Sequence, residues 1–120
     1  MTKMSYLGSK SSKPLAWLHE TIKSPPFTEA ARVEAGFLLR QLQDGVKLGL
    51  PHSRPMPDIG RNCHELRIRD ETVAWRIFYA IESVAIVVLA VEMKKTEKTP
   101  HAVMELCSKR IADFRRLIDG

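Results

Sequence analysis

Residues 64–93 read HELRIRDETVAWRIFYAIESVAIVVLAVEM, and this stretch decides the fold. Residues 64–69 alternate in polarity, with Leu66 and Ile68 on one face and charged side chains on the other, as in a half-buried strand. Residues 74–81 alternate as well and are rich in aromatic and β-branched side chains. Residues 84–93 are almost entirely apolar, which is typical of a central strand buried on both faces. The connections between them are short, so the stretch predicts an antiparallel meander.

The flanking segments predict one further strand and two helices. Residues 13–18 (KPLAWL) fit an edge strand, with a helix start as the alternative. Residues 28–43 predict a helix with Thr28 as its N-cap, because apolar side chains recur every three or four residues. Residues 49–60 contain three prolines and two glycines and predict a loop. Thr99 and Pro100 predict the N-cap and first position of a final helix. We therefore expect an α+β domain, with an antiparallel sheet and helices packed on one of its faces.

The length and composition limit the class of protein. The 120 residues suit one domain, and we expect a flexible leader over residues 1–12 and a single folded domain over residues 13–120. The longest apolar run has eight residues, whereas a membrane helix needs about 20. The first residues also lack the apolar segment of a secretory signal, so we expect a cytoplasmic protein with no membrane contact. Cys63 and Cys107 form no zinc or redox motif, and we expect two reduced thiols. The 19 Lys and Arg against 14 Asp and Glu favour a polyanionic partner.

Three short blocks carry a family resemblance: residues 51–69 (PHSRPMPDIGRNCHELRIR), 74–79 (AWRIFY) and 93–100 (MKKTEKTP). In this order they resemble the phage-derived HigB-like toxin family, within the RelE/ParE superfamily of type II toxin–antitoxin systems, over residues 13–116. The resemblance implies a RelE-like, microbial-RNase-like fold and an mRNA interferase, an endoribonuclease that cleaves mRNA on the ribosome without a metal or other cofactor. It also implies a cognate helix-turn-helix antitoxin, through which alone the toxin would meet DNA.

Two other functions are compatible with the same fold. ParE-like relatives inhibit DNA gyrase, and a degenerate toxin would keep only the binding of its antitoxin. The clustered basic residues favour RNA cleavage over a degenerate module, although cations that bind RNA and cations that cleave it look alike in a sequence.

The chemistry of RNA cleavage explains why a basic cluster is of interest. When a 2′-OH attacks the neighbouring phosphate, the protein must accept its proton, neutralise the charge on the phosphorus and protonate the leaving 5′-oxygen. Arginine offers a planar fork to phosphate oxygens, whereas lysine acts as a point charge that can also move a proton. The sequence contains no evident Ser-His-Asp set or carboxylate pair, so lysines and arginines are the main catalytic candidates.

The resemblance places the catalytic candidates on the second and third blocks. Arg76 matches the phosphate-stabilising arginine of RelE-like toxins, the alternative being a solvated arginine paired with Glu65 or Glu82. Lys94 and Lys95, directly after the last strand, match the family's basic pair, and Lys98 completes the cluster. The alternative is a solvated charge run. His101 lies where RelE has a helical tyrosine that transfers a proton. If His101 is only a first-turn helix residue, Tyr79 or a lysine must take that role. The catalytic candidates are thus Arg76, Lys94, Lys95, Lys98 and His101.

A second set of residues could bind the RNA. Arg67 and Arg69 share a strand face and could follow the phosphate backbone, or form a simple exposed basic face. His52 and Arg54 lie in the loop just before this strand, and His64 opens it. A histidine suits proton transfer, but a lone histidine is more often structural. Trp75 and Tyr79, on the next strand, could stack on bases. Their alternation with Ile77 and Ile81 favours a place in the core instead. The substrate-binding candidates are His52, Arg54, His64, Arg67, Arg69 and Tyr79.

Overall fold

The computed structural model describes residues 12–120. The leader expected over residues 1–12 therefore lies, except for Ser12, outside the described residues. The elements in chain order are β1 (Leu15–Trp17), α2 (Glu29–Gln43), β2 (Ser53–Pro55), β3 (Cys63–Asp70), β4 (Val73–Ile81), β5 (Ile86–Met93) and α3 (His101–Asp119). No helix in this part of the chain is long and apolar enough to cross a membrane.

The strands form one five-stranded sheet in the order β1-β5-β4-β3-β2. The meander of β3, β4 and β5 is confirmed, since both of its strand pairs are antiparallel. Residues 15–17 form the expected edge strand, but β1 runs parallel to β5, so the sheet is mixed. Because the whole of β2 to β4 lies between β1 and β5 in the sequence, the connection is long enough for parallel pairing. The predicted α+β class is confirmed, with this correction to the antiparallel sheet.

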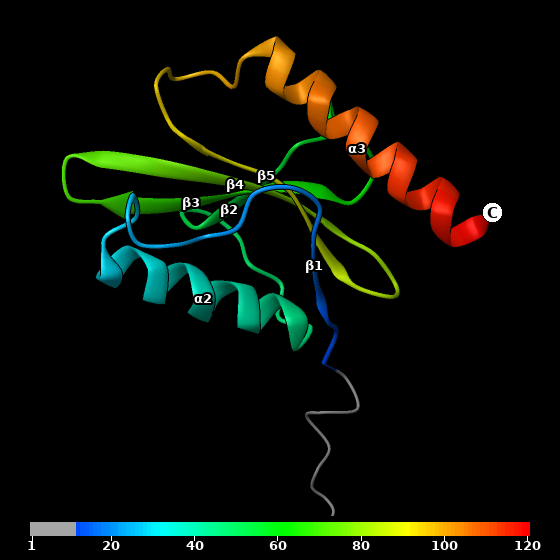
Figure 1. The fold of residues 1–120 in the computed structure, drawn as a ribbon, viewed down its shortest axis with the longest axis horizontal. Coiled ribbons are helices and arrows are strands. Elements are labelled where there is room, and N and C mark those ends of the chain that lie inside the picture. The colour runs from blue at the N-terminus through cyan, green and yellow to red at the C-terminus, as the bar shows by residue number, and fades with distance from the viewer. Residues whose placement is uncertain (1–11) are drawn as a thin grey trace, which may run out of the picture.

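The two helices pack on opposite faces of the sheet, not on one (Figure 1). Alternate side chains of β3, β4 and β5 join α2 in one apolar cluster, and the intervening side chains join α3 in a second. The physical reason is that β4 and β5 are apolar on both faces. A sheet with two apolar faces needs helices or loops packed on each side. The sequence of β4, which is largely apolar on both faces, already indicated this arrangement.

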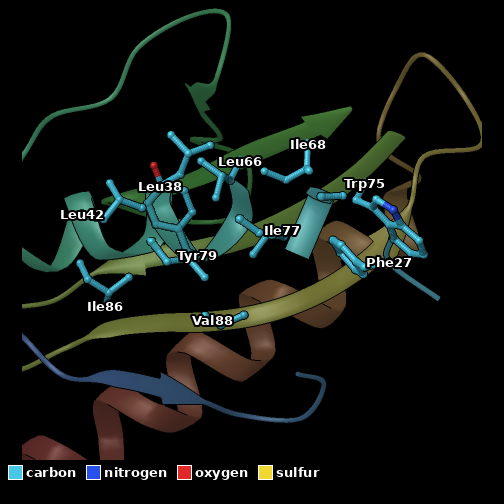
Figure 2. Packing of buried hydrophobic residues seen from close by; sticks show 13 residues of the cluster. Phe27, Leu38, Leu42, Leu66, Ile68, Trp75, Ile77, Tyr79, Ile86 and Val88 are labelled. Carbon is cyan, nitrogen blue, oxygen red and sulfur yellow. The ribbon is translucent and has the colours of Figure 1, made fainter. Parts of the chain in front are cut away.

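The α2-side cluster fixes how α2 lies on the sheet (Figure 2). Trp75 is buried there and stacks on Phe27, with ring centroids 4.1 Å apart. Its indole nitrogen donates a hydrogen bond to Asp70, 2.9 Å away, and Asp70 also accepts hydrogen bonds from the backbone N–H and hydroxyl of Thr28. Thr28 is the N-cap of α2, as predicted, through a hydrogen bond from the N–H of Ala31 to its hydroxyl. Asp70 therefore joins the start of α2 to the β3–β4 turn.

Two local predictions were wrong. Residues 53–55, within the expected loop, form β2 and pair with β3. An edge position tolerates Pro55, which has no N–H to donate, so the prolines obscure the strand without preventing it. Thr99 does not cap α3, since the cap position is taken by Pro100. The Thr99 hydroxyl instead donates to the carboxylate of Glu65, 3.4 Å away.

Candidate functional site

Charged side chains gather on the α3-side face of the sheet, toward the β3–β4 turn. Arg67 lies directly opposite Arg76 in the β3–β4 pair, and Arg76 lies directly opposite Glu92 in the β4–β5 pair. Residues opposite one another across two strands share a face of the sheet. Glu65 is on this face as well, two residues before Arg67 on β3. The register thus brings four charged residues from three strands together.

A β-bulge in β5 gives Glu92 its place in this group. The register shifts between Phe78 and Tyr79, and Leu89 is passed over in the pairing. Val87 and Leu89 face α3, so strict alternation would send Glu92 to the α2 side. The extra residue of the bulge reverses the alternation and turns Glu92 toward Arg76.

Glu65 is the centre of the group and is completely buried, with 0% of its surface exposed. Its Oε2 is 2.9 Å from Nε of Arg76. Its Oε1 accepts hydrogen bonds from Nε of Arg54 at 2.9 Å and from Nε of Arg67 at 3.0 Å. Burial alone would raise the pKa of Glu65, but the hydrogen bonds and charges of Arg67 and Arg54 outweigh it and hold the pKa below its ordinary value. Glu65 is therefore a carboxylate, fully ionised at neutral pH.

Arg76 is nearly as buried, with 1% of its surface exposed. This excludes the alternative of a solvated side chain, while the pairing with Glu65 is present. Its Nη2 donates to the carbonyl oxygens of Thr96 at 2.7 Å and Glu97 at 3.0 Å. Its Nη1 lies 3.5 Å from Oε2 of Glu92 and has no hydrogen-bond partner among the described residues.

A hollow of about 280 Å³ opens beside Arg76, and we call it the Arg76 hollow. It is lined by Arg76, Glu92, Met93, Lys95, Thr96 and Pro100. The hollow is thus lined by one arginine with a donor group that lacks a hydrogen bond, by one carboxylate and by one lysine. An anion is the ligand that such a donor group accommodates best.

The basic segment after β5 folds around Arg76 and brings the predicted lysines to this face. In Figure 1 this segment arches from the end of β5 to the start of α3. The Lys94 backbone N–H donates to the carbonyl of Ala74 at 2.8 Å, and its side chain lies 3.8 Å from Glu97. Lys95 is exposed at the Arg76 hollow. Lys98 is exposed beside a second hollow of about 400 Å³, the Arg54 groove, which extends to Arg54 on β2.

The predicted arginines of β2 and β3 also join the site. The Arg54 and Arg67 side chains are 35% and 39% exposed, and each contacts Glu65 through its Nε. Arg69 is exposed two residues beyond Arg67 on the same strand. These side chains extend the positive charge along the face from the Arg76 hollow.

The remaining predicted residues are not brought to this site. The His101 side chain is 81% exposed, lies 3.3 Å from Glu105 and lines a separate hollow with Asp58. His52 is exposed before β2, and its carbonyl accepts a hydrogen bond from the Arg67 N–H at 2.8 Å. Neither histidine lines the Arg76 hollow.

Tyr79 and His64 lie on the α2 side of the sheet, opposite Arg76. Their rings stack with centroids 5.2 Å apart, and the Tyr79 hydroxyl is hydrogen-bonded to Ser53 at 2.6 Å. Burial raises the pKa of Tyr79, partly offset by the Ser53 hydrogen bond, and burial lowers the pKa of His64. Trp75 is also buried on this side, as its alternation with Ile77 predicts. Tyr79 and Trp75 belong to the core, whereas His64 is half-buried beside Tyr79. None of the three lines the Arg76 hollow.

Sequence reasoning missed three residues of the site: Glu65, Glu92 and Thr99. The signal for Glu65 was present, because it alternates with Arg67 on the face opposite Leu66. Glu92 could not be placed without knowledge of the bulge, and Thr99 resembled an ordinary helix cap. No group of three or more His, Cys, Asp or Glu that could hold a metal occurs among residues 12–120.

The two cysteines lie apart from the site, Cys63 at the start of β3 and Cys107 on the buried side of α3. Both are buried free thiols, as the sequence predicts. Burial raises the pKa of Cys63 to about 11 and that of Cys107 to about 12. They therefore remain protonated at neutral pH and have the character of core side chains.

Comparison with known families gives one match. The family model for phage derived protein Gp49-like (DUF891) matches residues 26–112. The matched range is more than half of the chain and spans every residue of the site just described. Comparison with curated proteins gave no match, and comparison with solved structures gave none.

Proposed function

The chain belongs to the Gp49-like family of phage-derived proteins, a toxin-like family associated with toxin–antitoxin systems, and from this membership we propose that it is an mRNA-cleaving toxin. More narrowly, the proposal is a HigB-like, ribosome-dependent endoribonuclease. A toxin family implies an antitoxin partner. The proposed antitoxin carries a helix-turn-helix domain, and the proposed substrate is mRNA in the ribosomal decoding site.

The observation that carries the proposal is Nη1 of Arg76, which lies 3.5 Å from the Glu92 carboxylate but has no hydrogen-bond acceptor among the described residues. A buried donor group without a hydrogen bond costs about 1–3 kcal/mol. Nη1 is such a group, and Arg76 lines the Arg76 hollow. A phosphate oxygen in the hollow would supply the missing acceptor and would gain a charge-assisted hydrogen bond. The low exposure of the guanidinium strengthens that contact, because little water screens it.

The groups lining the hollow also suit the proton transfers of RNA cleavage. The 2′-oxygen forms a bond to phosphorus as its proton leaves, and the bond from phosphorus to the 5′-oxygen breaks as that oxygen gains a proton. Glu92 carries the carboxylate and Lys95 the amino group that line the hollow. We assign Glu92 the role of proton acceptor and Lys95 that of proton donor, while Arg76 stabilises the charge on phosphorus.

The basic face beyond the hollow suits the RNA on either side of the cleaved bond. Arg54, Arg67, Arg69 and Lys98 lie on this face or at its rim and can contact phosphates without reading bases. The net charge of the whole chain is only +5, which supports weak binding of free RNA. The ribosome would then supply both the binding and the in-line alignment of the 2′-OH.

The test combines growth and cleavage. Expression without antitoxin should stop growth and produce new 5′ ends within the codons of translated mRNAs. Purified protein should cut mRNA on programmed ribosomes much faster than the same RNA free in solution, and the slow cleavage of free RNA should not change with EDTA.

Three outcomes would contradict the proposal. Growth arrest with intact mRNA and loss of DNA supercoiling would indicate a gyrase inhibitor. Fast, EDTA-sensitive cleavage of free RNA would indicate a different nuclease mechanism. Binding of the antitoxin with neither growth arrest nor cleavage would indicate a degenerate module.

A further inference from the structure

Glu65 has an unusual position for a carboxylate beside a proposed phosphate site. It is completely buried, yet it lies between three arginines and accepts a contact from each. A carboxylate at this place repels a phosphate and reduces the positive charge available to bind it. Its presence therefore requires a reason other than attraction of RNA.

The geometry of the contacts supplies that reason. Each arginine is held by its Nε, so Glu65 occupies only one of the five N–H groups of each guanidinium. For Arg76, the carbonyls of Thr96 and Glu97 hold Nη2. This leaves Nη1, which lies 3.5 Å from Glu92 without a hydrogen bond, as the nitrogen that could donate to a ligand. For Arg54 and Arg67, the contact through Nε leaves the terminal nitrogens toward the partly exposed end of each side chain.

Thr99 and its loop complete this arrangement. The Thr99 hydroxyl donates to the same Oε2 that contacts Arg76. Glu65 therefore has contacts on both of its oxygens, from three strands and from the segment that carries the lysines. A group so enclosed has neither the free lone pairs nor the access to reach a 2′-OH.

We propose that Glu65 is a positioning residue that fixes Arg54, Arg67 and Arg76 as one array, with Nη1 of Arg76 directed at the reacting phosphate. This rests on the proposed function for the identity of the ligand, but the ordering of the arginines stands without it. The depressed pKa of Glu65 agrees with a permanently charged anchor, since such a group is a poor proton acceptor.

The sharpest test is Glu65→Gln, because charge and position then predict opposite effects. The variant makes the site more positive by one charge. If only charge mattered, RNA would bind more tightly and cleavage would be unchanged or faster. If position matters, the maximal single-turnover rate on programmed ribosomes should fall at least tenfold, with the half-saturating toxin concentration changed less than about threefold.

Two further variants complete the kinetic test. Glu65→Asp keeps the charge on a shorter side chain and should recover part of the rate. Glu82→Gln is the matched control: it removes a partly buried carboxylate that pairs with Arg115 at 2.8 Å, beneath α3 and outside the site. This control should lose stability but cleave at the parental rate. If Glu65→Gln fails to fold, Glu65→Asp serves as the test instead. A parental cleavage rate in Glu65→Asp, together with a disordered Arg76 side chain, would overturn the proposal.

A second measurement reads the position of Arg76 without any activity. The Arg76 Nε–H signal in an NMR spectrum should exchange slowly with water in the parent and at least tenfold faster in Glu65→Gln. If the parent does not cleave mRNA, the proposed function fails and this measurement still decides the ordering role. Unchanged exchange, or a parental maximal rate in folded Glu65→Gln, would overturn it. Loss of the acidic limb of the pH–rate profile in Glu65→Gln would also overturn it, because Glu65 would then act as the base.

Discussion

Replacing Arg76 with alanine should separate stability from catalysis, and the structure sets the size of both effects. Removing one partner of a buried ion pair typically costs about 3–5 kcal/mol, because the other charge is left without compensation. Glu65 would keep its contacts with Arg54, Arg67 and Thr99. We therefore expect a smaller loss of about 2–3 kcal/mol in the free energy of unfolding, which most domains of this size survive.

The effect on cleavage should be larger. Nη1 of Arg76 is the buried donor at the Arg76 hollow, and removal of one donor to a developing charge usually lowers the rate about 10²-fold or more. Arg76→Lys should recover the free energy of unfolding. Its cleavage rate should stay below a tenth of the parental rate. A single ammonium nitrogen can contact Glu65 or face the hollow, whereas the guanidinium does both at once.

The assay pairs urea unfolding with single-turnover cleavage on programmed ribosomes, at a temperature where every variant is folded. Trp75→Phe is the control, since it destabilises the opposite face of the sheet and should cleave at the parental rate. A folded Arg76→Ala protein that cleaves at the parental rate would refute the reasoning, and the site would have to lie elsewhere on the basic face.

Three further outcomes follow from the structure. Trp75→Ala should lower the free energy of unfolding by about 3–5 kcal/mol in urea denaturation, and Trp75→Phe by about 1–2 kcal/mol through loss of the hydrogen bond to Asp70. Hydrogen bonds from the backbone N–H and hydroxyl of Thr28, and from Trp75, lower the pKa of Asp70 below its ordinary value of 3.8. The contribution of Asp70 to stability is therefore complete above that value, and it is lost as the pH falls through the lower pKa of the folded state. Unfolding measured down this acidic range should therefore be less pH-dependent in Asp70→Asn, and equal dependence would exclude this role. His101→Ala should change the cleavage rate less than twofold, because the side chain is exposed and paired with Glu105, and a larger loss would bring α3 into the site.

The periodicity of the sequence predicted most of the framework. The meander and α2 followed from alternation and helical spacing, because burial of one face leaves a direct trace in the order of residues. Pairing across long distances leaves no such trace. The parallel contact of β1 with β5 and the pairing of β2 with β3 depend on how the chain returns to the sheet edges. The placement of α2 and α3 on opposite faces could have been predicted from β4 and β5, whose side chains are apolar on both faces.

The arginines and lysines that the sequence singles out lie on or beside one face of the sheet, but the sequence did not single out the carboxylates between them. For Glu65 the physical reason is its burial. A lysine or arginine near phosphate can be recognised by its charge alone. A buried carboxylate is tolerated only where several donors converge on it, and that convergence exists only in the folded register. Arg54, Arg67 and Arg76 come from three strands, so the environment of Glu65 is invisible in any one block.

Glu92 depends on an even smaller feature. The run Ile86–Val91 is apolar throughout, so a bulge at Leu89 leaves no break in the pattern. Yet that one extra residue decides whether Glu92 faces Arg76 or the α2 core. The prediction of Thr99 as a helix cap was wrong for a related reason. The block was interpreted through its lysines, whereas the Thr96 carbonyl and the Thr99 hydroxyl are what attach it to Arg76 and Glu65. Lys95 lines the Arg76 hollow and Lys98 lines the Arg54 groove, while Thr96, Glu97 and Thr99 are the residues that bind the buried ion pair. The charge of this segment and its conformation therefore depend on different residues.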